Sequence, residues 1–123
     1  MTAPQMAQSA YSVTATSVRT PRGTEYDAIA KITGRLKAST TSAAASFAGL
    51  VRALHDNRRL WTVLAADVSD DDNQLPKDVR AQIFYLAEFV FQHTSKVLQQ
   101  KGEVEVLIDI NSAILRGLKP KGI

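Results

Sequence analysis

The sequence predicts an all-α fold, a small antiparallel bundle of four main helices plus a weak N-terminal helical segment. Apolar residues recur at intervals of three, four and seven along four separate stretches, which is the periodicity of amphipathic helices. No stretch keeps the alternation of a half-buried strand, because the brief alternation of Val104, Val106 and Ile108 continues better at helical spacing. At 123 residues, the chain is long enough for one domain with its own core.

The expected organisation has three parts: an N-terminal segment over residues 1–22, the bundle over 23–118 and a short tail over 119–123. The first part is rich in Ala, Ser, Thr and Gln, so its helix propensity is low. Its apolar residues are Met6, Tyr11, Val13 and Val18. We expect this segment to dock loosely over a partner-binding groove and to move when the partner binds.

The first main helix follows Pro21 and Gly23, with Thr24 as its predicted N-cap and Asp27 three residues later, a variant of the capping box. It fades into the Ser/Thr run at residues 39–42. The last main helix carries an apolar face and ends before residue 119. That face consists of Leu107, Ile110, Asn111, Ile114, Leu115 and Leu118.

The second main helix should open near Ser42. Its predicted core positions are Phe47, Leu50, Val51 and Leu54, followed by Trp61, Leu64, Ala65 and Val68. Between these two groups the stripe passes through Asn57 and Arg58, so we predict a broken or polar helix there. Asp56 or Asn57 would then cap a new turn.

The third main helix should have Pro76 in its first turn and run to about Gln100, where Gly102 is the expected stop. Its apolar residues cannot all face one core. One stripe consists of Phe84, Phe91 and Leu98, the adjacent stripe of Ile83, Leu86 and Val90, and Tyr85 and Phe89 point elsewhere. Either this helix is buried nearly all round, or one face awaits a partner.

The net charge of +3 is unevenly distributed, with +5 through Trp61 and −2 after it. A basic first half could attract RNA or an acidic protein, and an ordinary solvated surface is the alternative. The chain has no cysteine, which excludes disulfides and thiolate chemistry. With no leader-like start and no membrane-length apolar run, we expect a cytoplasmic protein with no membrane insertion.

No catalytic constellation is evident, so we expect a protein that is not an enzyme and takes no cofactor, metal or small-molecule substrate. Asp70 and Asp72 have the spacing of the first two ligands of a calcium loop. The pattern then fails, because Leu75 replaces the turn glycine and Ala81 stands at the twelfth position. The two histidines, His55 and His93, have no further ligands at metal spacing.

The candidate partner-binding residues are Asn57, Arg58, Arg59, Trp61, Tyr85, Phe89 and Tyr11. Arg58, Arg59 and Trp61 could clamp nucleic acid or form a protein-binding hot spot. The alternative is that Trp61 is core and the arginines lie at a helix junction. Removing Trp61 should then cost about 3 kcal/mol or more.

Residues Asp56 to Asp67 form a long specific string that closely resembles the FlaF family of flagellar biosynthesis regulators from alphaproteobacteria, a family distinct from the archaeal archaellum protein of that name. Further matching segments are Leu75-Pro76, residues 80–83 and 86–90, Tyr11, residues 20–22, Glu25-Tyr26, residues 109–111 and 114–118. The resemblance therefore covers almost the whole chain.

The resemblance implies a cytoplasmic factor needed to make and export flagellin, acting as a flagellin-binding secretion chaperone and linked to control of flagellin translation alongside FlbT. A shorter similarity to the flagellin chaperone FliS involves Tyr11, Val18, Thr20-Pro21, Glu25 and residues 34–37. The alternatives are an RNA-binding regulator of flagellin messenger and an adaptor that joins flagellin to FlbT.

Overall fold

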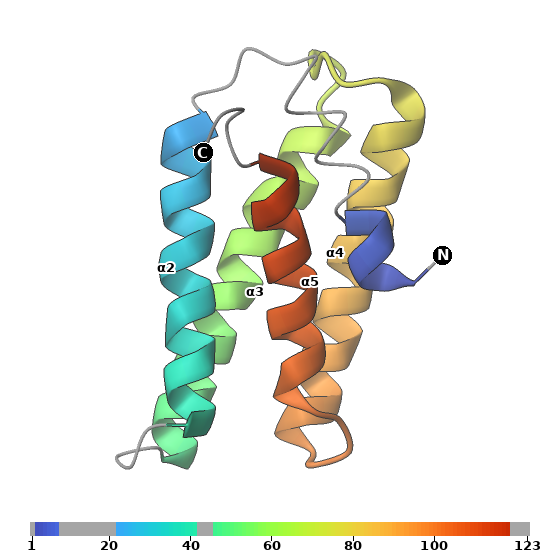
Figure 1. Ribbon diagram of the computed structural model, residues 1–123. Coiled ribbons are helices and arrows are strands. Elements are labelled where there is room, and N and C mark those ends of the chain that lie inside the picture. Colours follow the sequence, from blue (N-terminus) through green and yellow to red (C-terminus); the bar gives the residue numbers. More distant parts are fainter. Residues whose placement is uncertain (1, 8–21, 42–45, 119–123) are drawn as a thin grey trace.

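Four antiparallel helices form the bundle in the computed structural model, which describes residues 2–7, 22–41 and 46–118 (Figure 1). They are α2 (Arg22–Thr41), α3 (Phe47–Ser69), α4 (Lys77–Leu98) and α5 (Val104–Leu118). Helix α2 packs against α3 and α5, and α4 completes the ring by packing against α3 and, less extensively, α5. The predicted all-α class is confirmed, and the described residues contain no strand.

The core is built from one seam of each helix, at the spacing of three and four that the sequence shows. Its large apolar members are Ile29, Leu36, Leu54, Trp61, Val68, Val79, Ile83, Leu86, Val90, Val97, Leu107, Ile110 and Ile114. Burying each such side chain stabilises the fold by roughly 1.5–3 kcal/mol. The apolar face predicted for the last helix is confirmed from Leu107 to Ile114.

Helix α3 is continuous, so the predicted interruption at Asp56 to Arg58 is wrong. The prediction assumed that a polar residue in the apolar stripe must face water or cap a new turn. Asn57 instead lies on the core seam with no exposed surface, where its side chain has a hydrogen-bonding partner on α5. A buried polar group with such a partner does not interrupt a helix.

Two helix starts differ from their predicted positions. Helix α2 begins at Arg22, which places the predicted cap Thr24 inside its first turn. Helix α3 begins at Phe47, later than the predicted opening near Ser42, and residues 42–45 lie outside the described residues. Its N-cap is Ser46, whose Oγ accepts a hydrogen bond from the Gly49 N–H at 3.1 Å.

The residue that terminates helix α4 is Gln100, not Gly102 as predicted. Gln100 adopts the left-handed conformation with φ of 61°, its N–H donates to the Val97 carbonyl at 3.0 Å, and the next N–H donates to the Lys96 carbonyl at 2.8 Å. This is the hydrogen-bond pattern of a Schellman motif. Gly102 instead permits a close approach, because a Cβ there would lie 3.1 Å from the His93 ring.

The described N-terminal residues begin with a capping box that the sequence reading missed. The Thr2 Oγ1 accepts from the Gln5 N–H at 3.2 Å, and the Gln5 Oε1 accepts from the Thr2 N–H at 3.0 Å. Residues 3–7 are helical, with Met6 packed against the core and Ala7 fully buried. The expectation of a loosely docked cover extends to residues 8–18, which lie outside the described residues.

Candidate functional site

Trp61 lies at the centre of the core and is linked to α5 by a side-chain hydrogen bond. Its indole N–H donates to the Asn111 Oδ1 at 3.0 Å, and the Asn111 Nδ2 donates to the Asn57 Oδ1 at 2.7 Å. All three side chains have no exposed surface. These bonds join α3 to α5 across the bundle and so help to set the relative register of two helices that are far apart in the sequence.

The burial of Asn57 and Trp61 corrects the expectation that they could contact a partner directly. Of the two alternatives for Trp61, the structure has the core position. The Asn57 Nδ2 is buried and has no hydrogen-bond partner among the described residues. An unsatisfied buried amide costs roughly 1–3 kcal/mol. The Asn57 side chain therefore helps to fix the register of α3 against α5 but lowers the stability of the fold.

Arg58 and Arg59 are adjacent in the sequence but lie on different sides of α3. Successive helical residues are rotated by about 100°, so the two side chains leave α3 in different directions. The Arg58 guanidinium lies 6.0 Å from the centre of the Phe91 ring on α4. Arg59 lines a groove between α2 and α3. With Trp61 buried, these residues do not form one exposed cluster.

The candidate residues on α4 have different exposures. The Tyr85 side chain is exposed, whereas Phe89 is partly buried against the core and stacks on the His93 ring at 5.8 Å between centroids. The His93 Nε2 is 2.7 Å from the Glu103 carbonyl oxygen, which ties α4 to the start of the next helix. Tyr11, the remaining candidate, lies outside the described residues.

An exposed apolar edge follows the outer seam between α3 and α4. Its members are Phe47 and Val51 of α3 and Phe84, Phe91 and Leu98 of α4. Phe91 is half-buried, and the other four side chains are 36–60% exposed. The structure thus corrects the core positions predicted for Phe47 and Val51.

The contact between Arg58 and Phe91 shows that these residues share one edge. Helices α3 and α4 run antiparallel (Figure 1). A step of two turns from that contact therefore brings Val51 to the level of Leu98 and Ala65 to the level of Phe84. At the Phe84 end, the edge continues into a hollow of about 590 Å³ beneath the turn between the two helices. Leu75 and Val68 contribute apolar lining there, and Asp71, Lys77 and Arg80 contribute charges of both signs.

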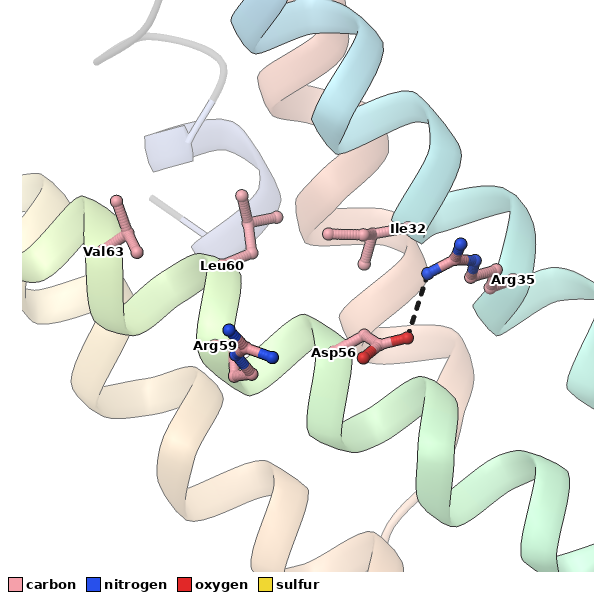
Figure 2. A pocket seen from close by; sticks show the side chains of 6 residues that line it. All are labelled: Ile32, Arg35, Asp56, Arg59, Leu60 and Val63. Carbon is pink, nitrogen blue, oxygen red and sulfur yellow. Dashed lines mark hydrogen bonds and ion pairs between the residues drawn. The ribbon is translucent and has the colours of Figure 1, made fainter.

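A second groove lies on the opposite edge of α3, between α2 and α3 (Figure 2). Its volume is about 310 Å³, and its lining residues are Ile32, Arg35, Asp56, Arg59, Leu60 and Val63. The Arg35 Nη1 and the Asp56 Oδ2 form an ion pair at 3.0 Å across the groove. The prediction that Asp56 caps a helix is therefore wrong, since it lies in mid-helix and links α3 to α2.

The acidic run after α3 is organised by hydrogen bonds to its own backbone. The Asp70 Oδ1 accepts from the Asp72 N–H at 2.9 Å, and the Arg80 guanidinium donates to the carbonyls of Val68 and Asp70 at 2.8 and 2.9 Å. Among residues 2–7, 22–41 and 46–118, no group of His, Cys, Asp or Glu is arranged to hold a metal ion. None of the described helices is long and apolar enough to cross a membrane.

A family model described as "Flagellar protein FlaF" matches residues 7–118. The chain belongs to the FlaF family. This match includes all four bundle helices, the core triad of Asn57, Trp61 and Asn111, and both grooves beside α3. The family resemblance of the sequence is thereby confirmed, and with it a role connected with the flagellum. Comparisons with curated proteins and with solved structures returned no match.

Proposed function

We propose that this FlaF-family protein is an export chaperone that binds flagellin in the cytoplasm and covers the apolar terminal helices of flagellin before secretion. The apolar edge between α3 and α4 is the observation that carries the proposal. It places three phenylalanines and two aliphatic side chains along one seam, and all of them except the half-buried Phe91 are at least 36% exposed. Extended exposed apolar surfaces of this kind are typical of interaction sites.

The chemistry of the client explains why such an edge would be useful. Flagellin subunits polymerise through apolar terminal helices, so a subunit that awaits export needs those helices covered without folding irreversibly. An amphipathic helix can lay its apolar face into a groove between two helices of a bundle. The spacing of Phe84, Phe91 and Leu98 at two-turn intervals matches the repeat of such a helix. Binding of this kind needs neither a nucleotide nor a catalytic residue.

The test compares the apolar edge with the opposite edge of α3. The double variant Phe84→Ser with Leu98→Ser should weaken the binding of monomeric flagellin by about tenfold or more, as measured by calorimetry. Val63→Ser is the matched control, because Val63 is 59% exposed on the other edge of the helix. Unchanged binding by the double variant, or an equal loss in the control, would overturn the proposed site.

Chaperone activity also requires that the complex keep flagellin from assembling. Light scattering of flagellin under polymerising conditions should stay low with a stoichiometric amount of this protein and rise with the double variant. If flagellin binds but polymerises as fast as it does alone, the protein is an adaptor rather than a chaperone. A pull-down with FlbT would then test whether it joins flagellin to that partner.

The alternative function is binding of flagellin messenger RNA through the basic first half of the chain. RNA binding depends on counterion release and weakens steeply with salt, whereas an apolar interface does not. Titrations against flagellin and against its messenger at low and high salt separate the two. Arg58→Glu with Arg59→Glu should abolish any RNA binding. Specific, salt-sensitive messenger binding that this variant loses would favour the RNA function.

A further inference from the structure

The groove between α2 and α3 combines an apolar floor with more positive than negative side chains. Ile32, Leu60 and Val63 supply the floor. The Val63 side chain is 59% exposed although it lies beside the groove between two helices. The charged lining consists of the guanidinium groups of Arg35 and Arg59 and the carboxylate of Asp56. The groove therefore has a net positive charge beside exposed aliphatic surface.

Arg59 is the lining residue whose charge is uncompensated. Within the described parts of the chain it makes no hydrogen bond or ion pair, whereas Arg35 is paired with Asp56 at 3.0 Å. A guanidinium carries five N–H donors and can bind a carboxylate with two parallel hydrogen bonds. Figure 2 shows the Arg59 side chain on α3, one turn from Asp56 and apart from the Arg35–Asp56 pair.

The lining favours a protein ligand over a nucleic acid. None of the described residues that line the groove is aromatic, so a base would find no ring on which to stack. Three aliphatic side chains instead suit an apolar anchor such as leucine. The volume of about 310 Å³ is enough for one or two side chains of a bound segment.

We propose that this groove is a second docking site, separate from the apolar edge, and that it takes an acidic peptide segment of another protein. An aliphatic side chain of the segment packs on Leu60 and Val63, and a carboxylate one turn away pairs with Arg59 and with the outward donors of Arg35. The two sites lie on opposite edges of α3, so a client on one edge leaves the other accessible. The protein could then hold two partners at once.

The sequence provides a matched pair of variants for the test. Arg58→Glu and Arg59→Glu make the same charge change at adjacent exposed positions, but only Arg59 lines this groove. The probe is a capped helical peptide of Ala, Leu and Glu in which a Glu follows a Leu by one turn. A second peptide has Lys in place of every Glu, and an oligouridine RNA is the third probe. Binding to the full chain is measured by fluorescence anisotropy and mapped by amide chemical shifts.

We expect the Glu peptide to bind, the Lys peptide not to bind, and the shifts to map to α2 and α3 around Leu60. Arg59→Glu should weaken binding about tenfold or more, and Arg58→Glu about twofold or less. Val63→Ser, which changes no charge, should also weaken it and serves as the second variant if Arg59→Glu melts early.

Three results would overturn this inference: no binding of the Glu peptide, equal losses in the two arginine variants, or tighter binding of the RNA in the same groove. The last result would assign the groove to a nucleic acid. The probes contain no flagellin sequence and the apolar edge is intact in every variant. Failure here therefore leaves the flagellin proposal standing, and failure of that proposal leaves the peptide result unchanged.

Discussion

Helix α3 buries an asparagine on its inner seam and exposes a phenylalanine and a valine on its edge beside α4. Asn57 has no exposed surface, whereas Phe47 is 60% exposed. The difference follows from the partners available in each direction. Asn57 meets the Asn111 amide across the bundle, whereas Phe47 and Val51 lie beside the outer face of α4, where no further helix covers them among the described residues. The inner seam thus serves folding, and the outer edge is available for binding.

The largest effect should come from truncating the inner seam. Trp61→Ala removes the largest buried side chain and its hydrogen bond to Asn111, so we expect the free energy of unfolding to fall by about 3–5 kcal/mol. Urea denaturation followed by circular dichroism measures this. Val63→Ala, two residues further along α3 and exposed, should change stability by about 0.5 kcal/mol or less. Equal stabilities for the two variants would contradict the core position of Trp61.

The next largest effect should come from the polar member on α5. Asn111→Ala leaves the Trp61 N–H and the Asn57 Oδ1 without partners in the core, which should cost about 2–3 kcal/mol. In a cycle with Trp61→Phe, the two changes should be non-additive by about 1 kcal/mol, because each removes the same hydrogen bond. Additive effects would show that this bond does not couple the two residues.

The same comparison explains what could be predicted from the sequence. The spacing of apolar residues along the chain predicts four helices, their approximate ends and most core positions, because it identifies the face of each helix that is buried on folding. Spacing does not predict the continuity of α3 through Asn57, because the partner that makes a buried asparagine acceptable lies 54 residues away on another helix. The core position predicted for Phe47 is wrong for the converse reason. Spacing identifies an apolar face but does not reveal that no helix packs on it.

The candidate site was predictable to a lesser extent. The surplus apolar surface of the third main helix is a local property. Of the two residues expected to point away from the core, Tyr85 is exposed, whereas Phe89 is partly buried and the exposed edge instead includes Phe84. The divergence of Arg58 and Arg59 could be derived from helical geometry. What each side chain meets depends on the neighbours of α3, and this requires the packed bundle.

A smaller effect on stability is expected at the apolar edge. Substitutions there should weaken flagellin binding more than they lower stability, whereas substitutions in the core should mainly lower stability. Phe84→Ser alters a side chain that is 43% exposed, so the free energy of unfolding should fall by about 1 kcal/mol or less. Its effect on flagellin binding should be the larger one, whereas Val63→Ala should change neither stability nor flagellin binding appreciably. A loss of stability comparable to that of Trp61→Ala would place Phe84 in the core and remove the basis of the comparison.

The smallest effect should separate the two arginines of α3. Arg58→Ala removes a guanidinium 6.0 Å from the Phe91 ring together with the methylene groups beside it, so we expect stability to fall by about 0.5 kcal/mol. Arg59→Ala removes a side chain that forms no hydrogen bond or ion pair within the described residues, so its effect should be close to zero. Thermal unfolding of both variants at low and high salt measures the difference. The Arg58 effect should persist in high salt, because the contact with an aromatic ring is only partly electrostatic and the methylene packing is not screened. If Arg59→Ala were the more destabilising change, Arg59 would have an unrecognised partner within the fold, and it could not be the uncompensated charge that the second docking site requires.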